Sequence, residues 1–432
     1  MSLEVLRFVE AHLEETVEEL RLLCRQPSVS AQRWGIEECA RLVKELLEGA
    51  GLTAQLLPTP AEGYPLVYGE LRGRSPRTVL FYNHYDVQPP DPLEEWTSPP
   101  FEPALRDGHL YARGVSDDKG HIIARLAAIR ALKAVEGELP CSVKFCIEGA
   151  EEIGSPGFHQ FVEEHQELLR ADGCIWEGGG VNWQGQPLIT LGLKGIQFVE
   201  LECRTAARDA HSSYAPVVPN PSWRLVWALA TLKDHQERVL IPGFYDDVQP
   251  PSAEELAAVE ALPSEEEHLR TSLGLQDFLL GVKGADYRKR YLLEPACTIC
   301  GLEAGYTGEG SKTIVPAWAR AKLDFRLVPE QRPEDIVAKL KAHLAAHGFQ
   351  DIVVRDLAGE PAARTPLSHP WVALVREAAR DAYGLEPLLV PTMAGSGPMH
   401  SFTKTLGLPV ASAGIDHPDS RLHAPNENVR LD

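Results

Sequence analysis

Acidic and histidine side chains with the chemistry of metal ligands gather in five short segments of the chain. Imidazole and carboxylate groups without thiolate form the mixed nitrogen and oxygen sets that suit Zn²⁺, Mn²⁺ or Co²⁺. One such residue says little, whereas a set of ligands, a bridging carboxylate and a free base define a hydrolytic centre with two metals. The five segments are His84–Asp86, Gly114–Gly120, Glu148–Gly154, Trp176–Gly180 and His423–Glu427.

The first segment follows Thr78–Tyr82, a run of β-branched and aromatic residues that predicts a buried strand. Residues two apart on an extended chain point to the same side. His84 can therefore bind a metal while Asp86 accepts its other ring N–H, which fixes the tautomer. The alternative is a polar strand end with a solvated Asp86.

The second segment places Asp117 and Asp118 just before a region, His121–Val135, whose composition and spacing predict a helix. One aspartate would satisfy the N-terminus of that helix, which is the structural alternative. A second aspartate on a loop bounded by glycines suggests a further task. A carboxylate has two oxygens and can bridge two cations, and we place that bridge in this pair of aspartates.

The third segment follows a predicted strand, Ser142–Ile147, and contains Glu151 and Glu152. Adjacent carboxylates repel one another, and a cation offsets that repulsion. One of the pair can bind metal while its neighbour stays free as a general base for water. A solvated acidic loop is the alternative. The position at the carboxyl end of a strand favours the functional interpretation.

Glu177 and His423 complete the count of ligands. Glu177 follows a predicted strand, Asp172–Trp176, and His423 lies near the C-terminus; each alone is more typical of a structural or surface residue. Two histidines, one bridging aspartate and two glutamates give each of two metals three protein ligands. Positions then remain for water and substrate, as a catalytic site requires.

These segments, in this order over essentially the full length, resemble a metallopeptidase family. The family includes carnosine and other cytosolic dipeptidases, glutamate carboxypeptidase, acetylornithine deacetylase and succinyl-diaminopimelate desuccinylase. The resemblance implies two divalent ions per subunit, Zn²⁺ first and Mn²⁺ or Co²⁺ as alternatives. One ion would be held by His84, Asp117 and Glu177, and the other by Asp117, Glu152 and His423. It also implies Glu151 as general base, Asp86 as the residue that orients His84, and a cis peptide bond between Asp117 and Asp118.

Three further motifs resemble the substrate-binding parts of that family. Asp209–Ser213 resembles a lid segment whose histidine, here His211, reaches the active site of a partner subunit and stabilises the oxyanion, which implies a homodimer through the lid. Leu323–Pro329 resembles a lid strand with an arginine for the substrate carboxylate, here Arg326. Ala394–Pro398 resembles a loop that contacts the substrate backbone, here through Gly395 and Ser396. From the residues alone, a surface salt bridge is a nearly equal alternative for Arg326. The functional interpretation of Ser396 is weaker, because its loop can be explained by glycine flexibility alone.

The expected function is hydrolysis of an amide or peptide bond in a small substrate that bears a carboxylate. The strings His84–Pro89 and Phe325–Pro329 look like the dipeptidase branch, which makes a dipeptide the first choice. Glu177 is more typical of the deacylase and carboxypeptidase branches, so an N-acyl amino acid deacylase or a carboxypeptidase stays open. A non-catalytic metal-binding or peptide-binding protein is a more distant alternative, and the free carboxylate of Glu151 argues against it. A phosphoesterase or nuclease would want a basic cluster, and we find none.

The bulk properties agree with a small-molecule enzyme. The net charge is −20, from 42 basic and 62 acidic side chains, which argues against nucleic acid and anionic membranes as partners. No window is long and apolar enough to span a bilayer, and the charged start of the chain is not a signal peptide. The 8 cysteines are scattered, with Cys297 and Cys300 as the only C-x-x-C, and we interpret them as reduced thiols of a cytoplasmic protein.

The fold class that the pattern predicts is α/β with two domains. A discontinuous catalytic domain, residues 1–190 and 365–432, carries a mixed sheet with helices on both faces. The split is required because His423 must meet His84. Residues 191–364 form an inserted ferredoxin-like α+β lid or dimerisation domain, in which 241–295 is an acidic insertion without a readable shape. We predict helices at 2–22, 36–50, 221–235 and 333–347, and lid strands at 196–204, 318–327 and 351–356.

Overall fold

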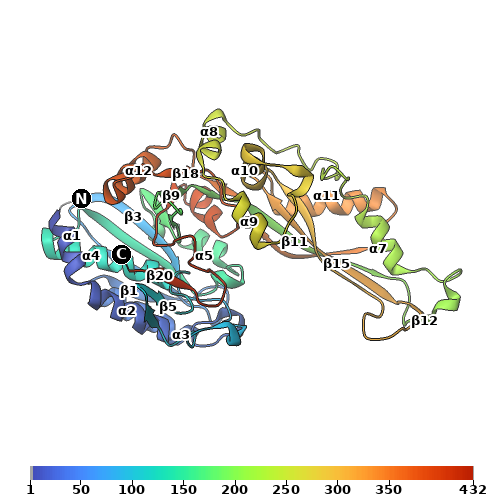
Figure 1. The fold of residues 1–432 in the computed structure, drawn as a ribbon, viewed down its shortest axis with the longest axis horizontal. Coiled ribbons are helices and arrows are strands. Elements are labelled where there is room, and N and C mark those ends of the chain that lie inside the picture. The colour runs from blue at the N-terminus through green and yellow to red at the C-terminus, as the bar shows by residue number, and fades with distance from the viewer. Residues whose placement is uncertain (1–2, 432) are drawn as a thin grey trace. The chain divides into compact units, whose positions relative to one another are not determined.

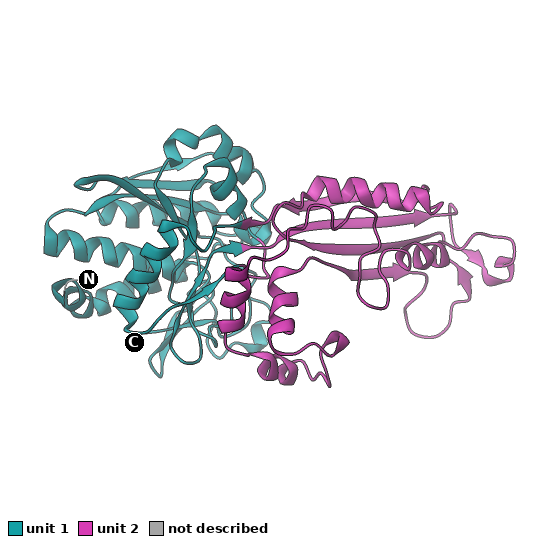
Figure 2. Cartoon of the chain, turned by 90° about the horizontal axis from the view of Figure 1, so that it is seen from above, with its two compact units in different colours: residues 1–192, 364–391, 397–432 teal, residues 193–363, 392–396 magenta. Residues whose placement is uncertain are grey.

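The computed structural model describes residues 3–431, which divide into two compact units (Figure 2). Unit 1 comprises residues 1–192, 364–391 and 397–432, and unit 2 comprises 193–363 and 392–396. The assignment of 392–396 to the catalytic domain is therefore wrong. Lys194 N donates to Met393 O at 3.1 Å, and Arg326 donates to Ser396 Oγ at 3.0 Å, so this stretch is held within unit 2. Met1, Ser2 and Asp432, at the ends of the predicted elements, lie outside the described residues.

Unit 1 is built on a mixed sheet of six strands, visible in Figure 1. In spatial order the strands are β1 (Thr53–Leu57), β2 (Leu66–Leu71), β6 (Cys141–Glu148), β3 (Ser75–His84), β7 (Gly173–Trp176) and β19 (Val410–Ser412). Four neighbouring strands run parallel, β2 is antiparallel to them at one edge, and β1 is antiparallel to β2, which confirms the mixed α/β class.

Helices cover both faces of this sheet. Consecutive residues of β3 point to opposite faces, so two neighbouring side chains show which helix lies on each face. On one face Phe81 lies under Arg125 of α4 (Lys119–Glu136), at 5.3 Å from the ring centre. On the other face Tyr82 packs edge-on against Phe158 of α5 (Phe158–Glu164), at 5.6 Å between ring centres. The predicted helix after Asp118 is thereby confirmed. The other helices of this unit are α1 (Leu3–Ala11), α2 (Leu13–Arg25), α3 (Ile36–Gly49), α6 (Gln166–Leu169) and α12 (Pro370–Tyr383).

The single helix predicted at 2–22 is two helices, α1 and α2. The break falls at His12, whose backbone has non-helical angles (φ −112°, ψ 16°) and whose ring Nδ1 lies 2.8 Å from Phe8 O. The ring competes with the backbone for that carbonyl at the point where the helix ends.

Unit 2 is a four-stranded antiparallel sheet with a connectivity of ferredoxin type. Its spatial order is β13 (Ala296–Ala304), β15 (Trp318–Leu327), β11 (Gly195–Arg204) and β16 (Val353–Glu360), and its helices are α7 (Pro221–Leu229) and α11 (Pro333–Ala346). Alternate residues of β15 are buried, as the sequence pattern predicts. Helix α7 ends six residues earlier than predicted, because Thr231 Oγ1 donates to Ala228 O and the chain then turns into a bridge between Lys233 and Val239.

The insertion 241–295 is helical. It contains α8 (Ala253–Ala261), α9 (Glu266–Ser272) and α10 (Gly284–Leu293), and it packs a small core of Val259, Leu292 and Leu293. Helix α8 begins with a capping box in which Ser252 and Glu255 exchange hydrogen bonds, a signal that the sequence does carry. Helix α10 and the short strand β12 (Ala210–His211) lie at opposite ends of the unit 2 sheet (Figure 1).

The remaining strands are short. They are β4 (Ala104–Arg106), β5 (His109–Tyr111), β8 (Gly180–Val181), β9 (Pro187–Thr190), β10 (Gly192–Leu193), β14 (Ile314–Val315), β17 (Ala363–Arg364), β18 (Leu388–Val390) and β20 (Asn428–Arg430). None of the helices in residues 3–431 combines the length and the apolar character that crossing a lipid bilayer needs.

Candidate metal centre

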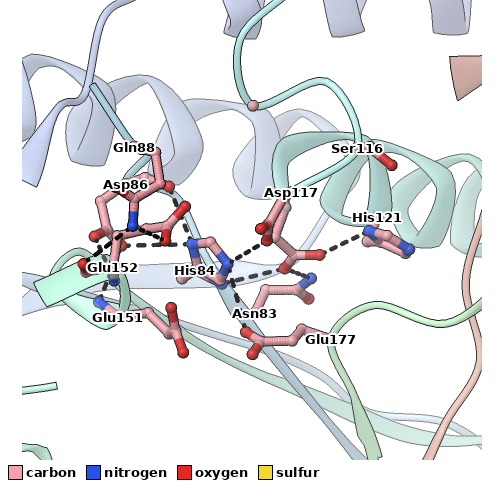
Figure 3. A network of polar contacts seen from close by, with 12 residues as sticks. Asn83, His84, Asp86, Gln88, Ser116, Asp117, His121, Glu151, Glu152 and Glu177 are labelled. Atoms are coloured by element: carbon pink, nitrogen blue, oxygen red, sulfur yellow. Dashed lines mark hydrogen bonds and ion pairs between the residues drawn. The ribbon is translucent and has the colours of Figure 1, made fainter. Parts of the chain in front are cut away.

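The carboxyl ends of three neighbouring parallel strands bring the acids of unit 1 together (Figure 3). Strand β3 ends at His84, β6 ends just before Glu151 and Glu152, and β7 ends just before Glu177. His84 and Glu148 are direct partners in the register of β3 and β6. Parallel strands end at one edge of a sheet, and that edge is where α/β proteins place their sites. Segments that are distant in sequence therefore meet there.

His423 reaches the same edge because the end of the chain pairs with an early strand. Strand β20 pairs antiparallel with β5, with Asn428 opposite Tyr111, and Ala112 N donates to Glu427 O at 3.1 Å. This pairing lays the segment of His423 beside the loop that carries Asp117. The two ends of the discontinuous unit are joined at the site.

Asp117 stands between the two histidines. Its Oδ1 lies 2.9 Å from His84 Nε2, and its Oδ2 lies 2.9 Å from His423 Nε2. Each histidine also has one glutamate near: Glu177 Oε2 lies 3.7 Å from His84 Nε2, and Glu152 Oε2 lies 3.2 Å from His423 Nε2. The structure thus brings all five predicted ligands into two clusters that share one carboxylate, the arrangement of a two-metal site.

The donor set fits divalent cations. Glu177 Oε2 is buried and accepts no hydrogen bond from the described residues. A buried carboxylate oxygen without a donor is costly, and a bound cation removes that cost. Oxygen and nitrogen atoms of His84, Asp117 and Glu152 lie within 4.8 Å of one another, and so do those of His84, Asp118 and Glu177. Residues of this kind at this spacing could hold metal.

Asp118 is close enough to compete with Asp117 for the role of ligand, but its oxygens are engaged elsewhere. Its Oδ2 accepts from Asn83 Nδ2 at 2.5 Å and from His84 N at 3.2 Å, and its Oδ1 lies 2.7 Å from His121 Nδ1. We therefore retain Asp117 as the shared ligand. The peptide bond between Asp117 and Asp118 is cis, as the resemblance implies.

The charges of the cluster shift the pKa values of its members. Burial lowers the pKa of His84, but Glu177 and Asp117 outweigh it and raise that pKa well above its usual value. Hydrogen bonds to Asp117 and Glu152 raise the pKa of His423 to about 10. Burial raises the pKa of Glu177. Without a cation the cluster therefore holds extra protons, and metal binding is expected to release them.

Asp86 holds the turn that carries the predicted base. Its carboxylate accepts the backbone N–H of Glu151 at 3.1 Å and that of Glu152 at 3.0 Å. His84 Nδ1 lies 3.5 Å from the carboxylate of Asp86 but 3.0 Å from its backbone oxygen. The contact expected between the two residues is present, and the nearer acceptor is the backbone oxygen. The side chain mainly fixes the position of Glu151 and Glu152.

The carboxylate of Glu151 is free of protein partners within residues 3–431. It begins the short 3₁₀ turn Glu151–Ile153, after β6. Burial raises the pKa of Glu151 well above its usual value, although His84 opposes the shift, and the charge of Glu152 adds to it. A carboxylate that is free and more basic than usual has the properties of a general base.

Glu427 is a buried carboxylate that holds a loop of the site, and the sequence does not predict this role. One oxygen accepts from Arg113 Nη1 at 2.7 Å and Gly114 N at 2.9 Å, and the other accepts from Ser116 N at 2.9 Å and Asp117 N at 3.0 Å. These four bonds fix the loop of Asp117. The sequence offers only a glutamate near the C-terminus, so this role depends on the pairing of β20 with β5.

The candidate substrate residues belong to unit 2. Arg326, on β15, donates to Ser396 Oγ at 3.0 Å and forms an ion pair with Asp324 at 3.2 Å, so the structure brings Arg326 together with the loop of Gly395 and Ser396. His211 is exposed on β12, opposite Ile314, and its Nδ1 lies 2.9 Å from Ser213 Oγ.

Comparison with known proteins agrees with the resemblance stated from the five segments. Residues 80–432 match the model of "Peptidase family M20/M25/M40". A crystal structure described as an M20 family metallo-carboxypeptidase, Sso-CP2, from Sulfolobus solfataricus is 41% identical, with a TM-score of 0.91 over 97% of this chain and 95% of that one. Human Beta-Ala-His dipeptidase is 29% identical over 87% of this chain and 75% of that protein. The Cys-Gly metallodipeptidase dug1 of Schizosaccharomyces pombe is 28% identical over 88% of this chain and 81% of that protein.

Proposed function

The chain belongs to peptidase family M20/M25/M40, and from that premise we propose that it hydrolyses the peptide bond of dipeptides with a free carboxylate. The observation that carries the proposal is the position of Asp117, with one histidine at each carboxylate oxygen. The similarity to dipeptidases from Homo sapiens and Schizosaccharomyces pombe supports a dipeptide as substrate.

In this proposal the residues of unit 1 hold the metals and supply the general base. His84, Asp117 and Glu177 would hold one divalent cation, and Asp117, Glu152 and His423 would hold the other. Bound cations supply polarisation of the scissile carbonyl and a lowered pKa for water, and Zn²⁺ suits the ligand set best, with Mn²⁺ or Co²⁺ as alternatives. Glu151 accepts the proton of the attacking water and returns it to the leaving amine. Asp86 holds Glu151 in place through its backbone N–H.

The residues of unit 2 would bind the substrate. The guanidinium of Arg326, which already donates to Ser396 Oγ, would hold the substrate carboxylate, bidentately where the geometry permits. Gly395 and Ser396 would contact the substrate backbone. This division makes unit 2 the lid of the enzyme.

We propose that the active form is a homodimer formed through unit 2. In this dimer His211 stabilises the oxyanion in the partner's site. Unit 2 exposes large apolar side chains around β12 and α7: Val217 is 77% exposed, Trp223 59% and Trp227 56%. Apolar side chains of this size at one surface favour a protein partner. The eight cysteines are free thiols, which supports a cytoplasmic location.

Mixing two inactive variants tests the dimer. Glu151→Gln removes the base and His211→Ala removes the oxyanion donor. If His211 acts in the partner's site, a mixed dimer contains one site with both residues intact, so activity returns on mixing. Two inactive variants that stay inactive after verified subunit exchange would refute action across the dimer.

Substrate depletion tests the function. Metal-stripped protein is reloaded with Zn²⁺, Mn²⁺ or Co²⁺ and offered dipeptides, longer peptides and N-acyl amino acids, with loss followed by mass spectrometry. We expect metal-dependent loss of dipeptides and no loss of the same dipeptides with an amidated C-terminus. Hydrolysis of amidated dipeptides at equal rates would contradict the role of Arg326.

A carboxypeptidase is the second candidate, since the 41% identical Sulfolobus solfataricus structure is described as one. The chemistry and the residues are the same, and the difference lies in substrate length. Stepwise loss of C-terminal residues from longer peptides would select this activity. Loss of N-acyl amino acids alone would select the deacylase alternative.

A further inference from the structure

A cavity of about 620 Å³ opens in unit 2, and its lining contains none of the residues assigned above. It lies along β13, the edge strand of the sheet, with Ala296 and Thr298 in its wall. The end of α10 and the segment 236–251 form the other walls. Its volume falls within the range of small-molecule sites, which is about 300–1,000 Å³.

Charged side chains line this cavity, and the positive ones are in excess. Lys233 forms an ion pair with Glu237, and Lys289 forms one with Glu294 at 3.5 Å. The four cationic side chains in the wall are Lys233, Arg238, Lys289 and Arg290, against two carboxylates, Glu237 and Glu294.

Arg238 and Arg290 are the two cations of the wall that are not in the ion pairs with its carboxylates. Both line the same cavity, and Arg238 has Asp234 nearby: the backbone N–H of Arg238 and its charge lower the pKa of Asp234. The chain as a whole has a net charge of −20, so a cavity whose wall has more cationic than anionic side chains differs from the rest of the molecule. A concave wall of one sign concentrates a ligand of the opposite sign.

The cavity also offers an apolar surface. Tyr245, Leu279 and Leu293 line it together with Pro250 and Pro251. Leu279 is 58% exposed and Tyr245 is 37% exposed, so this surface is open to solvent. A flat apolar group would cover the exposed side chains while its charged end meets the arginines.

We infer that this cavity binds a small organic dianion with a flat apolar body, of the class of nucleoside monophosphates. The guanidinium groups of Arg238 and Arg290 would donate to the phosphate oxygens, for which the planar fork of arginine is well suited. The ring of the ligand would lie against Tyr245 and the two prolines. None of these residues belongs to the proposed site, although Ala296 in the cavity wall is the strand partner of Arg326.

Isothermal titration calorimetry of the metal-loaded full chain tests the inference, with adenosine 5′-monophosphate as probe. Arg238→Gln with Arg290→Gln removes both donors, and Lys322→Gln with Lys341→Gln is a control that removes the same charge from exposed positions of unit 2. We expect the arginine double variant to weaken binding by about tenfold or more, as loss of charged hydrogen bonds does, and the lysine control to leave it unchanged. Leu279→Asp, at an exposed position, is expected to weaken binding as well.

Two further ligands test the contribution of the charge and the contribution of the ring one at a time. Adenosine lacks the charge and inorganic phosphate lacks the ring, so each should bind more weakly than the monophosphate by about tenfold. No measurable binding of the monophosphate to the wild-type chain, or equal binding by the arginine double variant with an unchanged melting curve, would overturn the inference. Equal affinity for adenosine would overturn the role of the charge.

Discussion

Two ion pairs, one in each unit of this chain, differ in burial and in what they hold in place. In unit 1 the ion pair of Arg113 and Glu427 is buried, with both side chains 1% exposed. In unit 2 the ion pair of Arg224 and Asp351 lies at the surface, with the side chains 30% and 44% exposed. The first pair fixes the loop of Asp117, and the second joins α7 to the turn before β16.

The difference follows from what each unit has to position. Burial of charge is expensive and is repaid only by complete hydrogen bonding, which Glu427 has with four donors. A buried network of this kind is expected where the carboxylates that bind metal must keep fixed positions. The unit 2 sheet rests on an apolar core, with Leu323 and Phe325 fully buried, and a surface ion pair such as Arg224–Asp351 is expected to add little to its stability. Unit 2 also buries single charged side chains, Lys194 at 3% and Glu200 at 6% exposed, but among residues 3–431 neither belongs to an ion pair with both partners buried.

Replacement of Glu151 should have the largest effect on turnover while leaving unit 1 intact. Glu151→Gln removes the base but none of the proposed ligands. We expect kcat to fall by about 10²–10⁴-fold, the usual contribution of a general base. Metal content, measured by atomic emission, should equal that of the wild type. Glu167→Gln, at an exposed position, is the control, and loss of metal in the Glu151 variant would show that Glu151 is a ligand instead.

Replacement of Glu427 should have the largest effect on stability. Glu427→Gln keeps the shape of the side chain but leaves the guanidinium of Arg113 buried without its anion. We expect the free energy of unfolding to fall by about 3–5 kcal/mol, as it does when one partner of a buried pair is removed. Metal affinity should fall too, because the loop of Asp117 loses its anchor. Denaturant unfolding measures the first effect, and a change below 1 kcal/mol, on the order of a surface pair, would contradict the comparison between the units.

The sequence predicts that three of the proposed ligands lie near one another because they follow strand ends. His84, Glu152 and Glu177 each follow a run of strand-forming residues, and parallel strands bring such positions together. The strand at 318–327 is also predicted to the residue, since alternate positions of β15 are buried. In both cases a local pattern determines the result.

The sequence does not predict features that depend on distant pairing. The role of Glu427 requires β20 to lie beside β5, and the membership of 392–396 in unit 2 requires Met393 to bond to Lys194. The carboxylate of Asp86 meets Glu151 and Glu152 only because β3 and β6 are neighbours. The insertion was unreadable because its short helices pack only a small core of their own.

Replacement of Arg326 should have a smaller effect, confined to substrate binding. Arg326→Gln removes the donor for the substrate carboxylate, and loss of a charged hydrogen bond costs about 1.5–3 kcal/mol. We therefore expect kcat/KM for dipeptides to fall by about 10–100-fold, mostly through KM. Arg320→Gln is a matched control, because Arg320 lies on the same strand and pairs with Glu303 at the surface. Equal losses in the two variants would remove Arg326 from the substrate site.

Replacement of Asp351 should have the smallest effect, and it depends on pH. Arg224 lowers the pKa of Asp351 below its usual value, so the pair stabilises the folded chain above the pKa of the unfolded carboxyl, near 4. We expect Asp351→Asn to lower the free energy of unfolding at pH 7 by about 0.5 kcal/mol, the size of an exposed ion pair. As pH falls through the folded pKa, Asp351 is protonated and the difference from the variant disappears. Denaturant unfolding of both proteins across this range measures the difference, and added salt should reduce it at pH 7. A difference as large as that of Glu427→Gln would mean that unit 2 also depends on its ion pairs, against the contrast drawn between the units.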